Sequence, residues 1–444
     1  MLRFAPSPTG FLHMGNVRVA LLNYLYAKKN NLNFFLRIDD TDRERSKKEY
    51  VDSIIDDLKW LGIDFSNVIR QSDRAKKYND IFIYLKKKNF IYPCFETPEE
   101  LSLKRKILLK QGKPPIYDRT SLNLKKSEIS SLINSGSNPH WRLKLDDKSI
   151  SWKDMIHGTI TFKDLSISDP VVFRSDEMPL FTITSVIDDA DMKVSHILRG
   201  DDHITNTAAQ IKLFKILDSA IPNFGHFPLM KALSGKGLSK RSESFSIKEF
   251  RRKKIFTIVI LSYLKRIGTN QPIEEIDNLD SLIKSFDLQG FSKNSVFFNP
   301  EDIERLNSKY IKTIDYENLK EKFDIKFDSF FWEIIKPNVD SIQEASDWFD
   351  LLNNNFEQKE RIMVKKDIKS LIIKYIPKKI DKDSWSMWTK QILENCDIKP
   401  KDLYTTLRTI LTGKKFGPSM NSLLTLIVKD EIIKRVESNC EEEN

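Results

Sequence analysis

The sequence predicts an α/β protein in which a parallel sheet covered by helices is interrupted by an α+β insertion and followed by a mainly α-helical C-terminal region. Short apolar runs alternate with helix-period segments over residues 1–92, which is typical of parallel strands joined by crossover helices. The same pattern returns over 179–217, after a stretch rich in turn signals. From about residue 300 onward helix-period segments dominate and strand signals become weak, which predicts the helical end.

The elements of the first sheet half follow in order. Residues 2–5 form a short apolar start that fits a first strand, and 34–38 fit a second strand buried on both faces. Between them lies a helix over about 16–29, which its first residue, an asparagine, can cap. A second helix is expected over 51–61, where a glycine stops it, and a third carries the apolar positions of 78–85.

Residues 93–178 interrupt this alternation. Prolines open the region, and 141–175 contain short strand-like runs punctuated by glycine and proline, so we expect an α+β insertion. A strand over 194–198 and a helix over 203–217 then resume the first pattern. The expected domains in chain order are 1–92 as the first sheet half, 93–178 as the insertion, 179–217 as the second sheet half, 218–300 as a connecting region, and 301–444 as the helical region.

The C-terminal region contains amphipathic stretches at 341–353, 364–375 and 384–395, each of which predicts a helix. The last residues, 441–444, are expected to be a frayed tail. At 444 residues the chain is too long for one ordinary core, so two to four domains are expected.

Composition narrows the class of protein. The chain is 40% hydrophobic and 31% charged, as globular proteins are, and its three cysteines are too few and too far apart for a disulfide framework. A reducing compartment is favoured, so we expect a cytoplasmic protein. The longest apolar run, 255–264, is about half a bilayer span, and Arg3 interrupts any signal-peptide core, so no membrane partner is expected. The net charge of +10 suits a nucleic-acid partner, but a composition rich in Lys, Asn and Ile, as AT-biased genomes produce, explains the charge equally well.

A block at residues 3–16, RFAPSPTGFLHMGN, occupies the turn between the first strand and the first helix. A turn that runs into a helix N-terminus offers unpaired N–H groups and the positive end of the helix dipole, which suit phosphate. Gly15 permits a close approach of the backbone to a nucleotide, and His13 can donate to a phosphate oxygen as charge develops. A single histidine before a helix is more often structural, so this block alone leaves both interpretations open.

A second block, GKGLSKR at 235–241, lies far along the chain. Lys240 supplies a mobile positive charge on a glycine-rich loop that can close on a triphosphate, and Ser239 adds a hydroxyl donor. Alone, the loop is equally compatible with a solvated basic turn or an RNA contact. The Gly-Lys-Ser/Thr pattern of a P-loop is absent, which disfavours a P-loop ATPase. The two blocks together indicate one nucleotide gripped from two sides.

Both blocks resemble signatures of the glutamyl-tRNA synthetase family, which belongs to the class I aminoacyl-tRNA synthetases and here takes its bacterial form. The first resembles the HIGH motif and the second resembles the KMSKS loop. Further blocks at 37–43, 179–189 and 196–203 resemble the same family, and the similarity continues to 407–418. The resemblance therefore spans nearly the whole chain.

The resemblance implies a Rossmann-like catalytic domain, an insertion that holds the tRNA acceptor end, a stem-contact region at 218–300 that carries the KMSKS-like loop, and a helical anticodon-binding region. It implies a monomeric glutamate–tRNA ligase that uses ATP, with Mg²⁺ on the nucleotide, to convert L-glutamate to glutamyl-adenylate and to load tRNA-Glu. His13 and Lys240 would be the catalytic residues. The implied ATP-binding residues are Pro6, Ser7, Thr9, Gly10, His13, Gly15, Asn16, Gly237, Leu238, Ser239, Lys240 and Arg241.

The implied glutamate-binding residues are Arg3, Ser7, Asp39, Phe181, Ser185 and Arg199. Arg3 and Arg199 would clamp carboxylates, because a guanidinium makes a bidentate contact with them, and Asp39 would pair with the α-ammonium group. Three departures from the family bear on this site. The family usually has Glu at position 39, and often has Tyr at 181 and Asn at 185, so side-chain length and donor groups are lost here.

Some bacterial relatives hold zinc in the insertion through paired cysteines. Here Cys94 remains, while Glu96 and Ser121 stand where further ligands are expected. Structural zinc needs four good ligands, so no zinc and no other protein-bound metal is expected. The same region carries basic residues that either meet tRNA phosphates or form a solvated helix face: Lys104, Arg105, Lys106, Lys110 and Lys113.

Alternatives to tRNA-Glu charging stay open. In one alternative, the enzyme would attach glutamate to tRNA-Gln, either in addition to tRNA-Glu or exclusively, for later amidation. A glutaminyl-tRNA synthetase is disfavoured because such enzymes end in β-barrels, and a truncated tRNA-modifying relative is disfavoured because it lacks the helical end. A more remote alternative is a non-catalytic tRNA-binding paralogue with a decayed pocket, against which the retained His13, Gly15, Ser239 and Lys240 argue.

Overall fold

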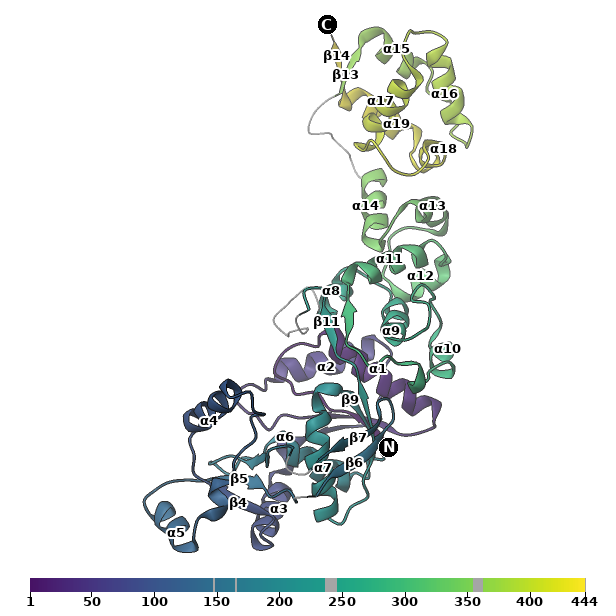
Figure 1. Ribbon diagram of the computed structural model, residues 1–444. Coiled ribbons are helices and arrows are strands. Elements are labelled where there is room, and N and C mark those ends of the chain that lie inside the picture. The colour runs from purple at the N-terminus through teal and green to yellow at the C-terminus, as the bar shows by residue number, and fades with distance from the viewer. Residues whose placement is uncertain (147, 164–165, 236–245, 354–361, 444) are drawn as a thin grey trace. The chain divides into compact units, whose positions relative to one another are not determined.

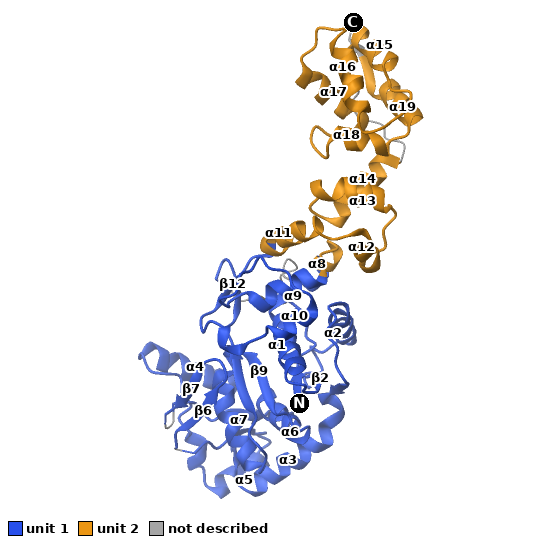
Figure 2. Ribbon diagram, turned by 90° about the vertical axis from the view of Figure 1, so that its right-hand side faces the viewer, with its two compact units in different colours: residues 1–249, 257–300 blue, residues 250–256, 301–444 orange. Residues whose placement is uncertain are grey.

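The computed structural model describes residues 1–146, 148–163, 166–235, 246–353 and 362–443 (Figure 1). The chain divides into two compact units, which Figure 2 shows in different colours. The first unit holds residues 1–249 and 257–300, and the second holds 250–256 and 301–444. Among the described residues, no helix has the length and apolar character needed to cross a bilayer.

The sheet of the first unit is parallel, as the alternating pattern predicts. Strand β2 pairs with β1 on one side and with β3 on the other, and β9 pairs with β10 in a second parallel ladder. A backbone hydrogen bond from Ser195 N to Met1 O (3.0 Å) links the two ladders next to β1. Every residue of β2 is buried, which explains why its sequence FFLRI shows no polar alternation. The strands are β1 Leu2–Phe4, β2 Phe34–Ile38, β3 Val68–Arg70, β9 His196–Gly200 and β10 Asn223–Phe227.

Helix α1, Met14–Lys29, is the predicted first helix and is buried over much of its surface. The side-chain amide of Asn23 donates to Leu198 O (2.9 Å) and so fixes α1 against β9. Arg18, which is also buried, donates to Pro228 O (3.0 Å) and to Ile267 O (2.8 Å). Four further helices accompany the sheet: α2 Lys48–Trp60, α3 Ala75–Lys87, α6 Phe181–Asp191 and α7 Ile204–Ile216.

The insertion is α+β, as predicted, and its strands are antiparallel. Strand β5 pairs with β4 and β8, and β6 pairs with β7. Its apolar core is continuous with that of the sheet half, since Phe82 of α3 packs on Trp141 (ring centroids 5.5 Å apart) and on Phe173 (4.6 Å). The elements are β4 Ile91–Cys94, α4 Pro98–Lys110, α5 Lys126–Asn134, β5 His140–Leu143, β6 Ile150–Asp154, β7 Gly158–Phe162 and β8 Val171–Phe173.

Most of the apolar run at 255–264 belongs to α9, which begins at Thr257 and is buried from Val259 onward, so this part is a core helix as expected. Strands β11 and β12 pair in parallel within the same unit. The remaining elements up to the boundary are β11 Met230–Ala232, α8 Ile247–Arg252, α9 Thr257–Arg266, α10 Leu279–Lys284 and β12 Val296–Phe298.

The second unit is mainly helical, with one small parallel sheet that corrects two expectations. Residues 440–443 form a strand paired with 362–365, so 441–443 are not the frayed tail expected there. The helix expected over 364–375 begins only at Lys366, because Val364 turns inward in that strand and is buried. The elements are α11 Pro300–Ile311, α12 Tyr316–Lys322, α13 Ser329–Ile335, α14 Ile342–Asn353, β13 Ile362–Lys365, α15 Lys366–Lys374, α16 Ser384–Leu393, α17 Pro400–Thr412, α18 Met420–Leu423, α19 Lys429–Asn439 and β14 Cys440–Glu443.

Gly268 offers a stability test for which Gly62 is the control, because both have φ near +75° (+76° and +74°). A Cβ at Gly268 would collide with Val296 Cγ1, whereas at Gly62 no atom lies within 4 Å. We expect Gly62→Ala to lower the free energy of unfolding by about 1 kcal/mol through backbone strain alone. Gly268→Ala is expected to lower it by roughly 2 to 4 kcal/mol, because overpacking adds to the strain. Denaturant unfolding measures both values, and equal losses would contradict the close approach.

Candidate active site

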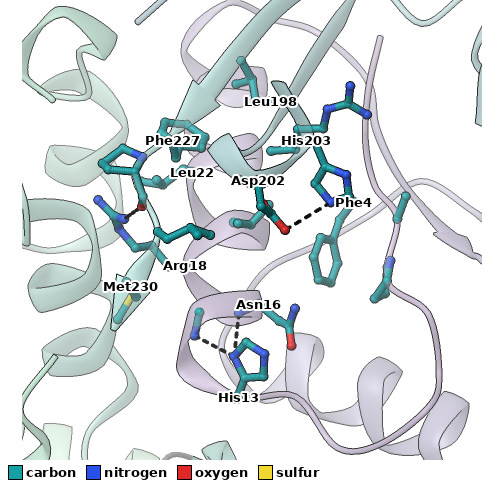
Figure 3. Close-up of a pocket in the computed structure, with 18 of the residues that line it drawn as sticks. Phe4, His13, Asn16, Arg18, Leu22, Leu198, Asp202, His203, Phe227 and Met230 are labelled. Atoms are coloured by element: carbon teal, nitrogen blue, oxygen red, sulfur yellow. Dashed lines mark hydrogen bonds and ion pairs between the residues drawn. The ribbon is translucent and has the colours of Figure 1, made fainter. Parts of the chain in front are cut away.

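A cavity of about 640 Å³ lies at the carboxyl ends of β1 and β9, beside the N-terminus of α1 (Figure 3). This is the edge at which parallel α/β sheets bind their ligands. Both predicted sheet halves contribute to its wall, so the structure brings together residues that are far apart in sequence. The expected site residues that line it are Arg3, Pro6, Ser7, His13, Gly15, Asn16, Phe181 and Arg199.

His13 is the N-cap residue of α1. Its Nδ1 accepts hydrogen bonds from the backbone N–H groups of Gly15 (3.1 Å) and Asn16 (3.3 Å), the dashed lines beside His13 in Figure 3. A ring nitrogen that accepts these bonds carries no proton, so the neutral ring holds its proton on Nε2. The helix cap thereby selects the tautomer that can donate to an anion from Nε2.

The remaining residues of the first block lie close to this cavity. Thr9 lines a neighbouring cavity of about 290 Å³ together with Asp39, and Ser7 and Phe181 line both cavities. Gly10 lies in the turn that leads to α1. Asn16 lines the cavity, and its buried side-chain Oδ1 has no hydrogen-bond partner within the ranges that the structure describes.

The second block lies outside the described residues, so Gly237, Leu238, Ser239, Lys240 and Arg241 have no described position. The described residues on either side of it are close to the first block. Lys231, in β11 before it, lines the large cavity. Ser246, the first described residue after it, forms an antiparallel bridge with His13, and Ile247 N donates to Leu12 O (3.3 Å).

A buried network of charges joins the ends of β1 and β2 to α6. Arg3 donates to both carboxylate oxygens of Asp189, at 2.9 and 3.2 Å. Arg37 donates to Asp189 Oδ1 (2.7 Å) and makes a bidentate contact with Asp39 (2.7 and 3.2 Å). All four side chains are nearly inaccessible to water. Arg3 and Asp39 are therefore already paired inside the protein. Each can bind a ligand only through the hydrogen-bonding capacity that these contacts do not use.

The two carboxyl groups of this network respond differently to burial. Burial raises the pKa of Asp39 from 3.8 to about 6, and the nearby Arg37 reverses only part of that effect. Burial would also raise the pKa of Asp189, but the charges of Arg3 and Arg37 outweigh it and hold that pKa below its ordinary value. Asp39 is thus ionised, and able to bind an ammonium group, only above about pH 6.

Arg199 is a cation of the cavity wall for which no ion pair with an acidic side chain is found among the described residues. It lies in β9 with 6% of its surface exposed, and its hydrogen-bond acceptors are neutral groups of Thr207, Gln210 and His226. The Nη1 atom is buried and has no hydrogen-bond partner in the described part of the chain. Burial, and next the charge of Arg3, lower the pKa of Arg199 to about 9, so the side chain remains charged at neutral pH. A charged donor without an anion is a site where a carboxylate would be stabilised.

Ser185 is fully buried, so the structure places it behind Arg199 rather than in the cavity wall. Its Oγ accepts from Gln210 Nε2 (2.7 Å) and donates to Phe181 O (2.6 Å), while Gln210 Oε1 accepts from Arg199 (2.6 Å). Phe181 begins α6 and packs on His203, with ring centroids 5.2 Å apart. Ser185 is therefore connected to Arg199 through Gln210.

Sequence reasoning missed several residues that define the site. Asp189 and Arg37 lie inside two of the family blocks, but the sequence analysis assigned them no role. An arginine inside an apolar strand such as 34–38 is expected to be buried and therefore to need hydrogen-bonding partners, and Asp189 is one of those of Arg37. Thr207 and Gln210 lie on α7 outside the blocks, where the sequence offers no signal. His203 lines the cavity, and burial followed by the charge of Arg199 lowers its pKa to about 4, so it is neutral at physiological pH.

The residues considered for zinc do come together, but they are joined by hydrogen bonds. The Tyr117 hydroxyl lies 2.8 Å from Glu96 Oε1, 3.0 Å from Ser121 Oγ and 3.7 Å from Cys94 Sγ. Burial raises the pKa of the Cys94 thiol, which makes it a poor metal ligand. In the described part of the chain, no group of three or more His, Cys, Asp or Glu side chains could hold a metal ion.

A parallel sheet whose carboxyl edge meets a helix N-terminus is the arrangement with which α/β proteins bind phosphate-bearing ligands. Comparison with known families gives the particular class. Residues 1–305 match the family described as tRNA synthetases class I (E and Q), catalytic domain, and 304–440 match the anticodon binding domain. The chain belongs to the class I tRNA synthetases for glutamate and glutamine, and it is an aminoacyl-tRNA ligase. The predicted fold class is confirmed.

Individual relatives are similar along nearly their full length. A glutamate–tRNA ligase 1 of Rickettsia felis is 41% identical over 441 residues, which cover 98% of each chain. One of Wolbachia pipientis is 40% identical and covers 99% of this chain and 98% of its own. The crystal structure of a glutamate-tRNA synthetase from Elizabethkingia anophelis has a TM-score of 0.81 at 23% identity, covers 98% of both chains, and shows the same fold.

The raised pKa of Asp39 predicts how stability depends on pH. The carboxyl ionises near pH 4 in the unfolded chain but only near pH 6 in the folded one, so its contribution is present below pH 4 and is lost as pH rises through 6. We expect the melting temperature of the wild type to fall, relative to that of Asp39→Asn, between pH 4 and pH 6.5. Scanning calorimetry of both proteins measures this difference. A difference that is constant with pH would mean that Arg37 offsets the burial completely.

Proposed function

We propose that this chain is a glutamate–tRNA ligase that activates L-glutamate with ATP and transfers the glutamyl group to the 3′ end of tRNA-Glu. The observation that carries the proposal is Arg199, a charged cavity residue. Its hydrogen-bond partners among the described residues are neutral, and its Nη1 has no partner among them. A substrate carboxylate would satisfy both the charge and the donor. The names of relatives 40 and 41% identical, glutamate–tRNA ligase, support the same substrate.

ATP would occupy the large cavity with its phosphates at the N-terminus of α1. His13 would donate from Nε2 to a phosphate oxygen, in the tautomer that its helix cap imposes. Lys240 and Ser239 would close on the triphosphate from the other side, because Lys231 and Ser246 anchor the flanks of their segment beside the cavity and His13. The other nucleotide contacts would come from Pro6, Ser7, Thr9, Gly10, Gly15, Asn16, Gly237, Leu238 and Arg241.

Glutamate would lie between Arg199 and the charge network. Arg199 would hold a carboxylate, and Arg3 would add the donors that Asp189 leaves unused. Asp39, with help from Ser7 and Phe181, would hold the ammonium end above about pH 6. These contacts would orient the α-carboxylate for in-line attack on the α-phosphorus, with diphosphate as the leaving group.

The second step would use the tRNA as nucleophile. The terminal ribose hydroxyl would attack the carbonyl of the glutamyl-adenylate and release AMP, so no covalent enzyme intermediate is needed. Positioning and electrostatics would then supply the catalysis. Mg²⁺ would enter with ATP as the counter-ion of its phosphates, and we expect a monomeric enzyme that acts in the cytoplasm.

The tRNA would contact three regions of the chain. The insertion, 93–178, would hold the acceptor end, and 218–300 would contact the stem. Residues 301–444, most of which match an anticodon binding domain, would meet the anticodon. The basic residues of α4, among them Lys106 and Lys110, are candidates for phosphate contacts.

Charging of purified tRNA transcripts tests the proposal. We expect radiolabelled glutamate to be attached to tRNA-Glu, and radiolabelled glutamine to be attached to neither tRNA-Glu nor tRNA-Gln. Glutamate attached to tRNA-Gln as well, or instead, would identify the enzyme that supplies an amidotransferase. Attachment of glutamate to neither tRNA, by protein that still binds them, would favour a non-catalytic paralogue.

Lys240→Ala tests the second block. If Lys240 stabilises the triphosphate in the transition state, its loss lowers kcat for aminoacylation by roughly a hundredfold or more. The dissociation constant for tRNA, measured by filter binding, should change by less than about threefold, since one phosphate contact is the most the residue could lose. Parallel losses of both quantities would assign the lysine to RNA contact.

A further inference from the structure

We propose that His226, oriented by Asp154 of the insertion, is a positioning residue for Arg199 and thereby sets the affinity for glutamate. The inference rests on the proposed function, in which Arg199 binds a substrate carboxylate. His226 lies in β10, directly opposite Arg199 of β9 in the parallel ladder. Both members of the Asp154–His226 pair have fully buried side chains.

The guanidinium of Arg199 is held on its protein side by three neutral acceptors. Nη2 donates to Thr207 Oγ1 and to Gln210 Oε1, both at 2.6 Å, and Nε approaches His226 Nε2 at 3.5 Å. His226 Nε2 also lies 2.9 Å from Thr207 Oγ1. These contacts fix the plane of the fork while leaving its charge unneutralised. An aspartate in any of these positions would pair with Arg199 and compete with the ligand.

Asp154 fixes the tautomer of His226, so that Nε2, the ring nitrogen that faces Arg199, is an acceptor. Its Oδ2 lies 2.5 Å from His226 Nδ1, so the ring proton is held on Nδ1 and Nε2 keeps its lone pair. Burial lowers the pKa of His226, which favours the neutral ring. With a proton on Nε2, the ring would instead donate to Thr207 Oγ1 and could no longer accept from the N–H group of Arg199.

Asp154 is itself held rigidly. Its Oδ1 accepts from the backbone N–H groups of Ile156 and His157, both at 3.0 Å, and from His226 N at 3.3 Å. A backbone hydrogen bond from Met155 N to Phe224 O (2.8 Å) fastens the same turn to β10. The turn between β6 and β7 of the insertion therefore reaches Arg199 through one histidine.

The variants His226→Asn and His226→Gln separate positioning from packing. The amide nitrogen of Asn can take the place of Nδ1 and keep the bond to Asp154, but no acceptor then reaches Arg199. The amide oxygen of Gln can take the place of Nε2 and keep the acceptor. We expect His226→Asn to raise the KM for glutamate about tenfold and His226→Gln to raise it by less than about threefold. The KM for ATP should change by less than about twofold in both.

Aminoacylation kinetics with tRNA-Glu and thermal melting of each variant supply the readouts. Tyr92→Phe is the matched control, because it removes a buried hydrogen bond to Asp169 (2.7 Å) in the insertion without touching the cavity, and its KM for glutamate should not change. Asp154→Asn disturbs the partner of His226 but keeps the imidazole ring, so it should also raise the KM for glutamate. This variant replaces His226→Asn in the test if His226→Asn does not fold.

Several results would overturn the positioning role. They are an unchanged KM for glutamate in folded His226→Asn, equal increases in the Asn and Gln variants, and a parallel rise in the KM for ATP. The proposed function fails separately, since in that case the wild type itself attaches no glutamate. If the wild type charges tRNA-Glu and the KM for glutamate of His226→Asn is unchanged, the positioning role alone is refuted.

Discussion

The site depends on the removal of charged groups from water at the carboxyl edge of the sheet. Arg3 and Arg37 are buried there, and each has a carboxylate within hydrogen-bond distance in Asp189 or Asp39. Arg199 is buried nearby without such a partner. Burial of a charge without an ion-pair partner is strongly unfavourable. The hydrogen-bond acceptors that Arg199 has among the described residues are all neutral. Burial of the Arg199 charge costs free energy in the unliganded protein. A carboxylate ligand that pairs with Arg199 can recover that free energy on binding.

Much of the fold was predictable from the sequence because its signals are local. Apolar runs such as 34–38, and the helix period of 16–29, identified the parallel sheet and its first helix. The errors fall where tertiary pairing overrides local propensity. The strand at 440–443 exists only because 362–365 lies beside it, and a highly acidic chain end carries no strand signal.

The candidate site was predictable as a set of blocks rather than as a geometry. Arg3 and His13 belong to the sequence block 3–16 and Arg199 to the block 196–203. The structure brings all three to one cavity. The sequence does not show which of the buried polar and charged side chains contact one another. The pairing of Arg3 with Asp189 spans 186 positions, and Ser185 is connected to Arg199 through Gln210, which no local pattern marks.

The shared core of the insertion and the sheet half limits how this enzyme can be re-engineered. Phe82 of α3 packs against Trp141 and Phe173, so no polar boundary separates the two regions. Exchange of the insertion between related enzymes would leave mismatched apolar surfaces on both sides of that seam. A chimera would stay folded only if the matching face of α3 travelled with the grafted segment.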